Sequence, residues 1–299
     1  MFDAEGFVLC VTIVLAGPQE GPSRKRRSAI RRSLLTLASA LLASVGLALN
    51  IYPNNAAGDL FTNPGPSNAA QAVGATNWYY TNVCNSGAVG INGNLPYLGT
   101  GSAYMATPSG SAKADLEYWV LGSGGQPTVL GFLSNLESLS YSWYRNSAST
   151  VSDWLHPAFR LWVRWNDGSS VKQGYLVYEE VYNTAGYVAP TDQWVDVDVL
   201  GKKFWSTGSL PDAFTSYDRT LSDWSTLMPD AEVLALSMGV GSGWNGVFSG
   251  AVDNVEFSFV DQSSGSFNFE LESVPVPEPF TLALGATGLG SALLRRRRG

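Results

Sequence analysis

The chain has 299 residues, with 25 acidic and 18 basic side chains and a formal net charge of −7. Most of the basic residues lie near the two ends, so residues 58–272 hold 8 basic and 21 acidic side chains, a net charge of −13. A body this acidic repels nucleic acid and anionic lipid, which excludes polyanion-binding functions for it. The 32 glycines and 36 aromatic residues of the whole chain are typical of an all-β protein.

Residues 1–57 are predicted to be an N-terminal extension and signal peptide. Residues 24–32 are strongly basic, and residues 34–49 form an apolar run that predicts a signal helix. Small residues suit cleavage by signal peptidase at two places, Gly46 with Ala48 or Ala56 with Ala57. A retained transmembrane anchor is the alternative interpretation of the apolar run.

Residues 58–272 are predicted to form one antiparallel two-sheet β-sandwich, similar to a jelly roll. Alternating apolar and polar residues predict strands at 116–121, 139–143, 159–165, 195–199, 255–259 and 267–271. Asn166-Asp167-Gly168 predicts a hairpin turn, and the nearly continuous apolar segment Val233 to Val240 predicts a central strand. One short helix is expected near residues 220–228, because Thr220 can cap it and Pro229 follows its end.

Several features suggest catalysis but have simpler interpretations. His156 is the one histidine, so a histidine-based metal site or triad would rest wholly on it, and a satisfied loop or core residue is expected. Gly241–Gly246 matches Gly-x-Gly-x-x-Gly but leads into another strand, which predicts a hairpin loop. Asp196 and Asp198 share one strand face, and glycosidases use a pair of carboxylates, but outward carboxylates on a strand are usually only solvated. Cys84 is expected to be a small buried residue.

Two sets of residues are candidates for binding. Arg160, Trp162 and Arg164 share the outward face of one predicted strand, where a tryptophan offers a flat surface to a sugar ring and arginines can bond its hydroxyls. A cation–π ladder is the alternative. Asp253, with Asp59 near the start of the domain, is a candidate for a structural calcium ion, although calcium wants six to eight oxygens; a turn aspartate is the alternative. No other cofactor is expected.

Residues 273–299 have the order of a sorting signal. Two prolines flanking a glutamate keep the first part extended, and residues 280–294 then form an uncharged run that predicts a short hydrophobic helix. That helix is about 22 Å long, shorter than a bilayer core of about 30 Å. An arginine cluster closes the chain and resists translocation. The residues that define the signal are Pro277, Glu278, Pro279, Arg295, Arg296, Arg297 and Arg298.

This tail resembles the PEP-CTERM sorting signal of Gram-negative bacteria, and an ordinary tail anchor is the alternative. The resemblance implies export, transient residence in the inner membrane, processing by signal peptidase and an exosortase, and a final place at the cell surface or outside the cell. Segments of the body, among them residues 78–83 and 113–118, are similar to those of an uncharacterised group of such exported proteins. Residues 250–257 also resemble the last strand of jelly-roll carbohydrate-binding modules.

Two functions are consistent with these observations. The first is a non-catalytic surface or matrix protein associated with exopolysaccharide or biofilm, with polysaccharide as its candidate ligand. The alternative is a secreted polysaccharide-active enzyme, a glycoside hydrolase or lyase, that uses paired carboxylates. A groove that holds two carboxylates would favour the second function.

Overall fold

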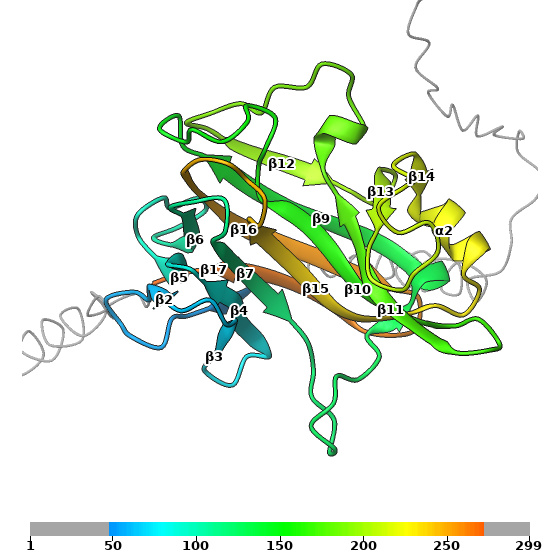
Figure 1. Ribbon diagram of the computed structural model, residues 1–299. Coiled ribbons are helices and arrows are strands. Elements are labelled where there is room, and N and C mark those ends of the chain that lie inside the picture. Colours follow the sequence, from blue (N-terminus) through cyan, green and yellow to red (C-terminus); the bar gives the residue numbers. More distant parts are fainter. Residues whose placement is uncertain (1–47, 272–299) are drawn as a thin grey trace, which may run out of the picture. The chain divides into compact units, whose positions relative to one another are not determined.

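The structure, a computed structural model, describes residues 48–271, and these form a sandwich of two β-sheets with one short helix (Figure 1). The predicted fold class is therefore confirmed. The predicted sorting signal and residues 1–47 of the predicted N-terminal extension and signal peptide lie outside the described residues, whereas residues 48–57 of that extension are described and include a β-strand at Leu49–Ile51. No helix within residues 48–271 has the length and apolar character needed to cross a membrane.

The first sheet, called sheet I here, has the strand order β1-β17-β16-β6-β5-β2, with β9 beside β16 and β12 beside β9. Its strands are β1 (Leu49–Ile51), β2 (Phe61–Asn63), β5 (Gly87–Asn92), β6 (Ser102–Thr107), β9 (Leu136–Arg145), β12 (Trp194–Asp198), β16 (Phe248–Phe259) and β17 (Ser264–Phe269). All neighbours are antiparallel except β1 and β17, which run parallel. The long strand β16 joins the two halves of the sheet, since β9 pairs along one of its edges and β6 and β17 along the other.

The second sheet, sheet II, has the order β14-β13-β11-β10-β15-β7-β4-β3, and β8 adds to β15. Its strands are β3 (Ala69–Val73), β4 (Trp78–Cys84), β7 (Lys113–Tyr118), β8 (Gly131–Phe132), β10 (Ala158–Asn166), β11 (Val171–Tyr178), β13 (Lys203–Ser206), β14 (Arg219–Thr220) and β15 (Glu232–Val240). Strand β15 lies between β7 and β10 and is buried almost throughout, as its continuous apolar sequence predicts.

The core lies between the inner faces of the sheets and is rich in aromatic rings. In β9 and β16 the predicted alternation is confirmed, because Trp143 and Phe257 point inward and are each 1% exposed. The ring of Trp78 packs edge-on against Phe267 and Phe269 at centroid distances of 5.2 and 4.9 Å. Burying rings of this size supplies much of the free energy that stabilises such a sandwich.

Local signals place the turns and the helix. The hairpin after β10 turns at Asn166-Asp167-Gly168, where Gly168 has φ +85°, a backbone conformation that glycine adopts without strain. Helix α2 (Leu221–Leu227) begins with a capping box, in which Thr220 and Asp223 each bond the other's backbone N–H. Two 3-10 turns, η1 (Leu133–Asn135) and η2 (Glu180–Tyr182), complete the described elements. Residues 60–77 contain the short strands β2 and β3.

Candidate functional site

The outer face of sheet II carries a row of polar side chains that crosses its central strands. Arg160 of β10 stands opposite Ser237 of β15, and Ser237 stands opposite Glu117 of β7. Residues paired across strands point to the same side of a sheet, so these three groups lie on one face. Glu117 lies on the outward face that the alternation predicts, yet it is only 4% exposed because neighbouring side chains cover it.

Two adjoining cavities of about 320 and 250 Å³ form a groove on this face. They share Arg160, Tyr175, Gly241 and Ser242, so the groove runs across β11, β10 and the loop after β15. The larger cavity also contacts apolar and aromatic residues and one carboxyl group; these are Trp205, Phe214, Trp244, Val177 and Glu179. The smaller cavity adds Asn82, Lys113 and Asp115. We call this feature the sheet II groove.

A fixed ion pair lies at the centre of the sheet II groove. The Arg160 guanidinium lies 2.5 Å from the Asp115 carboxylate, measured from Nη2 to Oδ1. Asn82 donates a hydrogen bond of 2.8 Å to the other oxygen of Asp115, and the Arg160 Cζ lies 5.5 Å from the centre of the Tyr175 ring. Burial by itself would lower the pKa of Arg160, but the neighbouring Asp115 raises it above its usual range. The pair is therefore charged and self-neutralising.

Two further carboxyl groups lie on this face of sheet II, and burial raises the pKa of both; Glu179 lines the larger cavity, whereas Glu117 lines neither cavity and lies beside Tyr175. Glu117 accepts a hydrogen bond of 3.0 Å from the Tyr175 hydroxyl, and its pKa is raised by burial and then by the nearby Asp115. Glu179 accepts a bond of 3.0 Å from the Trp205 indole N–H, and burial raises its pKa as well. Such groups hold a proton at higher pH than ordinary glutamates, so each can donate or accept a hydrogen bond.

The three binding residues predicted on β10 share the outward face but differ in what they contact. Arg160 lines both cavities of the groove. Trp162 is half-buried beside it, opposite Tyr175 of β11. Arg164 pairs with Glu232 across the strands, with 2.6 Å from Nε to Oε2, so its guanidinium already has a partner. The expected face exists, and one of its three residues lines a cavity.

The two aspartates predicted to hold calcium make separate hydrogen-bond networks. Asp59 accepts bonds from the backbone and side chain of Asn55, the backbone of Asn54 and the hydroxyl of Tyr80. Oδ1 of Asp253 accepts two backbone bonds of 2.8 Å, whereas its Oδ2 is buried without a partner. Among the described residues no three histidine, cysteine or acidic side chains are grouped as metal ligands would be.

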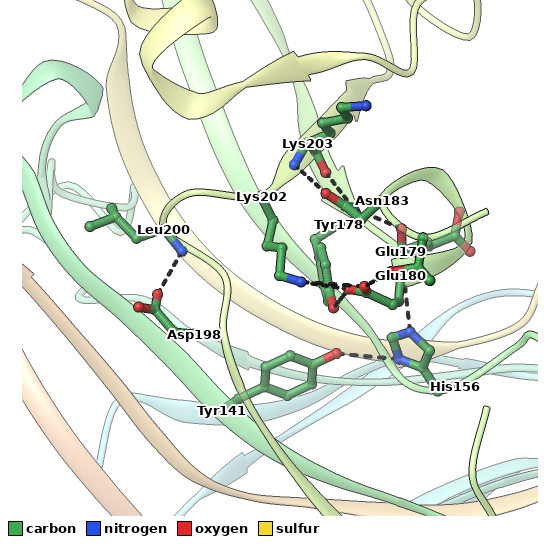
Figure 2. Close-up of polar contacts among 11 residues, drawn as sticks. Tyr141, His156, Tyr178, Glu179, Glu180, Asn183, Asp198, Leu200, Lys202 and Lys203 are labelled. Atoms are coloured by element: carbon green, nitrogen blue, oxygen red, sulfur yellow. Dashed lines mark hydrogen bonds and ion pairs between the residues drawn. The ribbon is translucent and has the colours of Figure 1, made fainter. Parts of the chain in front are cut away.

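Beside the edge strand β12 lies another cavity of about 320 Å³, which we call the edge pocket. It is lined by Trp143, Tyr178, Glu180, Tyr187, Pro190, Val195, Asp196, Val197, Asp198 and Lys202. Figure 2 shows the Lys202 amine reaching the Glu180 carboxylate, at 3.1 Å from Nζ to Oε2. The hydroxyl of Tyr178 donates to the same carboxylate at 2.5 Å.

His156 is buried against Trp143 and Glu180, two residues that line this pocket, and both of its ring nitrogens make polar contacts (Figure 2). Its Nε2 accepts the backbone N–H of Glu180 at 3.3 Å, and its Nδ1 lies 3.1 Å from the Pro157 carbonyl oxygen and 3.4 Å from the Tyr141 hydroxyl. The ring also stacks on Trp143 with 4.4 Å between centroids. Burial lowers the pKa of His156 to about 4, so the ring is neutral at ordinary pH. The predicted role of a satisfied core histidine is confirmed.

Sequence reasoning missed most of the groove. Alternation along residues 116–121 placed Glu117 outward, but nothing in the sequence distinguished it from other outward carboxylates. Glu179 follows β11 directly, and Trp205 comes from β13; only the order of the strands in sheet II brings them together. Asp196, expected to be simply solvated, accepts hydrogen bonds from Tyr97 and Ser142 on the outer face of sheet I.

No family model matches this chain, and no curated protein matches it. Among solved structures it is similar to a carbohydrate-binding module of the β-sandwich superfamily, at 12% identity over 64% of this chain and TM-score 0.32; the match spans only 56% of that module's chain. It is also similar to the family 11 carbohydrate-binding module from Clostridium thermocellum, at 10% identity over 75% of this chain and 96% of that one, TM-score 0.32. A third is endoglucanase cel12A from Rhodothermus marinus, at 15% identity over 66% and 96%, TM-score 0.31. At these TM-scores none of them identifies a ligand for this chain.

Proposed function

We propose that the domain binds a neutral glycan in the sheet II groove without cleaving it. The observation that carries this proposal is the combination of aromatic walls with fixed polar groups in one groove. Trp205, Phe214 and Trp244 offer apolar ring surfaces, while the Arg160–Asp115 pair offers hydrogen-bonding groups that are already held in place. Sugar rings have apolar faces and polar edges, so a groove of this composition complements them.

The charges of the groove favour an uncharged ligand. Arg160 is neutralised by Asp115, which leaves Lys113 as the one cation of the lining without an ion-pair partner among the described residues, set against the carboxyl group of Glu179. Burial raises the pKa of Glu117 and Glu179, and neither carboxyl group attracts an anion in either protonation state. The net charge of −13 over residues 58–272 adds a general repulsion of acidic polymers.

Trp162 extends the same surface along β10. It is half-buried and lies on the face that carries Arg160, opposite Tyr175, so a glycan that occupies the groove can continue over its ring. Stacking with a few hydrogen bonds usually gives micromolar to millimolar affinity, or about −4 to −8 kcal/mol. We therefore expect modest affinity for each binding site.

The test is a binding screen of the full chain with soluble neutral polysaccharides (a mixed-linkage glucan, a xylan and a mannan) against the acidic polymers alginate and polygalacturonate. We expect binding to one or more neutral polymers, and Trp162→Ala and Trp205→Ala should each weaken it at least tenfold. Trp194→Ala, a matched tryptophan change on the outer face of sheet I, should leave it unchanged. For Trp162→Ala the melting temperature should stay nearly constant, since this side chain lies on the outer face.

Two results would reject the proposal. One is binding to acidic polymers alone, and the other is equal loss of binding in the Trp194→Ala control. A large fall in the melting temperature of Trp162→Ala would show instead that this ring supports the core.

A second function, hydrolysis of the bound glycan, is favoured by one observation. Glu179 lines the groove and Glu117 lies on the same face of sheet II, bonded to the groove residue Tyr175, and burial raises the pKa of both. Glycosidases use one protonated carboxyl group together with a second carboxyl group. Asp196 and Asp198 are not this pair, because they lie on sheet I. Assaying the same samples for released sugars decides between the functions. Products that disappear in both Glu117→Gln and Glu179→Gln would make the protein an enzyme.

We further propose that the protein is exported and sorted to the cell surface or matrix, with signal peptidase and an exosortase as transient partners at the inner membrane. The basic and apolar segments at residues 24–49 and the tail that begins at Pro277 support this. Strand β1 distinguishes the consequences of the two possible cleavage sites for signal peptidase. Ile51 is fully buried in β1, which pairs with β17, so cleavage near Ala48 keeps a strand that cleavage near Ala57 would remove.

A further inference from the structure

The edge pocket is separate from the sheet II groove and has the features of a ligand site of its own. None of the residues that line it also lines the groove. It lies beside β12, which pairs with β9 alone among the described strands, and the half-buried Val195 and Val197 of β12 form part of its wall. A volume of about 320 Å³ is at the small end of the range for small-molecule sites.

One buried group in its wall lacks a partner. Trp143 lines the pocket, is 1% exposed, and its indole N–H has no hydrogen-bond partner among the described residues. A buried donor that is left unpaired is costly, and indole can only donate. The group that would satisfy it is an acceptor, such as a hydroxyl or ring oxygen. The nearest imidazole, that of His156, is stacked on the indole ring and has both nitrogens engaged, so it does not serve.

The rest of the wall specifies the chemistry of the occupant. Tyr178, Tyr187 and Pro190 provide flat apolar surface. The polar side chains that face the pocket are Lys202 and Glu180, because Asp196 and Asp198 alternate with Val195 and Val197 and carry their carboxylates on the other face of β12. Lys202 is paired with Glu180, so the pocket offers no free positive charge and an anionic ligand is disfavoured. A neutral ring with several hydroxyls can donate to the Glu180 carboxylate and accept from the indole N–H.

We propose that the edge pocket binds a single neutral sugar ring, either a free monosaccharide or the end residue of a glycan. A chain with this pocket and the sheet II groove can hold two glycan segments at once, one by an interior stretch and one by an end. The proposal does not depend on the groove, because the two sites share no residue.

The test follows the Trp143 indole resonance in a ¹H–¹⁵N spectrum of the full chain. The probes are D-glucose, D-galactose, D-mannose and N-acetyl-D-glucosamine, with D-glucuronate as the anionic comparison, each raised to about 100 mM because weak sites bind in the millimolar range. We expect at least one neutral sugar to move this resonance downfield in a saturable way, because an unpaired N–H gains an acceptor. A disaccharide that ends in the same sugar distinguishes a chain end from a free monosaccharide, since only a chain-end site accepts it.

Variants test whether the shift of the Trp143 resonance comes from binding in the edge pocket. Val197→Phe, at a half-buried position of the edge strand, should fill the cavity and weaken binding at least tenfold, and Lys202→Met should weaken it several-fold. Trp205→Ala, in the groove, should leave it unchanged. The proposal is wrong if no neutral sugar moves the Trp143 resonance, if glucuronate binds better than every neutral sugar, or if Val197→Phe folds normally and binds as before.

Discussion

The substitution Asp253→Asn should remove the part of the pH dependence of folding stability that comes from this buried carboxyl group. Asp253 lies on β16 and is fully buried; two backbone N–H groups donate to its Oδ1, and its Oδ2 has no partner among the described residues. Burial, together with a smaller effect of the nearby Glu270, raises its pKa to about 7 against the effect of the two backbone bonds. An aspartate in the unfolded chain titrates near 3.9.

The direction in which stability changes with pH depends on whether the folded or the unfolded protein binds the proton. Between about pH 4 and pH 7 the folded protein holds a proton on Asp253 that the unfolded chain has lost. The stability from this group is therefore full below about pH 4 and is lost as the pH rises through 7. Three pH units at 1.36 kcal/mol each correspond to about 4 kcal/mol. The D253N side chain does not titrate, so its free energy of unfolding relative to the natural chain should rise by about that amount from pH 4 to pH 8.

His156 changes folding stability with pH in the opposite direction, over nearly the same pH range. Its folded pKa of about 4 lies below the unfolded value near 6.5, so its contribution is present above pH 6.5 and is lost as the pH falls toward 4. That loss amounts to about 3 kcal/mol. In the natural chain these two effects nearly cancel between pH 4 and 6.5, and the D253N variant should uncover the acid sensitivity that His156 causes.

Urea denaturation followed by tryptophan fluorescence, at intervals from pH 4 to pH 8, measures both curves under identical conditions. The comparison uses the difference between the two proteins, so other titrating groups cancel from it. If this difference is the same at every pH, Asp253 is ionised throughout and burial does not control its protonation.

Three further outcomes are expected. Phe257→Ala should cost about 3 to 5 kcal/mol because its ring fills the core, while Asp198→Asn, on an exposed side chain, should stay within about 0.5 kcal/mol; equal costs would mean that the strand faces are misassigned. Thr220→Ala should cost about 1 kcal/mol through loss of the capping box, read from thermal unfolding, and no change would show that the cap contributes nothing. Mass spectrometry of the exported protein should find neither residues 24–48 nor residues 295–298, and full-length chain in the cytoplasm would contradict export.

Patterns within single segments predicted the local structure well. The alternation in β16 placed Phe257 inside, and Thr220 with Asp223 marked the start of α2, because such signals depend only on neighbouring residues. The groove depends on something else. Glu117 and Glu179 belong to separate parts of the chain, and only the order β11-β10-β15-β7 brings them to one face. No pattern within a single segment of the sequence indicates this order of strands.

The prediction on β10 shows the same division. Period-two spacing correctly put Arg160, Trp162 and Arg164 on one face. Which of the three side chains is free to bind a ligand depends on the neighbouring strand, where Glu232 forms an ion pair with Arg164. A carboxylate on β15 was needed to decide this, and the pairing of β10 with β15 is a property of the fold.

The parallel pairing of β1 with β17 gives the domain a mechanical property. The chain enters through β1 and leaves through β17, and the two strands run side by side in the same direction, with Leu49 opposite Phe267 and Ile51 opposite Phe269. Tension applied between the two ends pulls these strands along their length in opposite directions, so their hydrogen bonds are loaded in shear and share the force. Bonds loaded together resist rupture better than bonds opened one at a time. When both ends of the domain are held, this short seam carries the load together with the antiparallel pairing of β17 with β16.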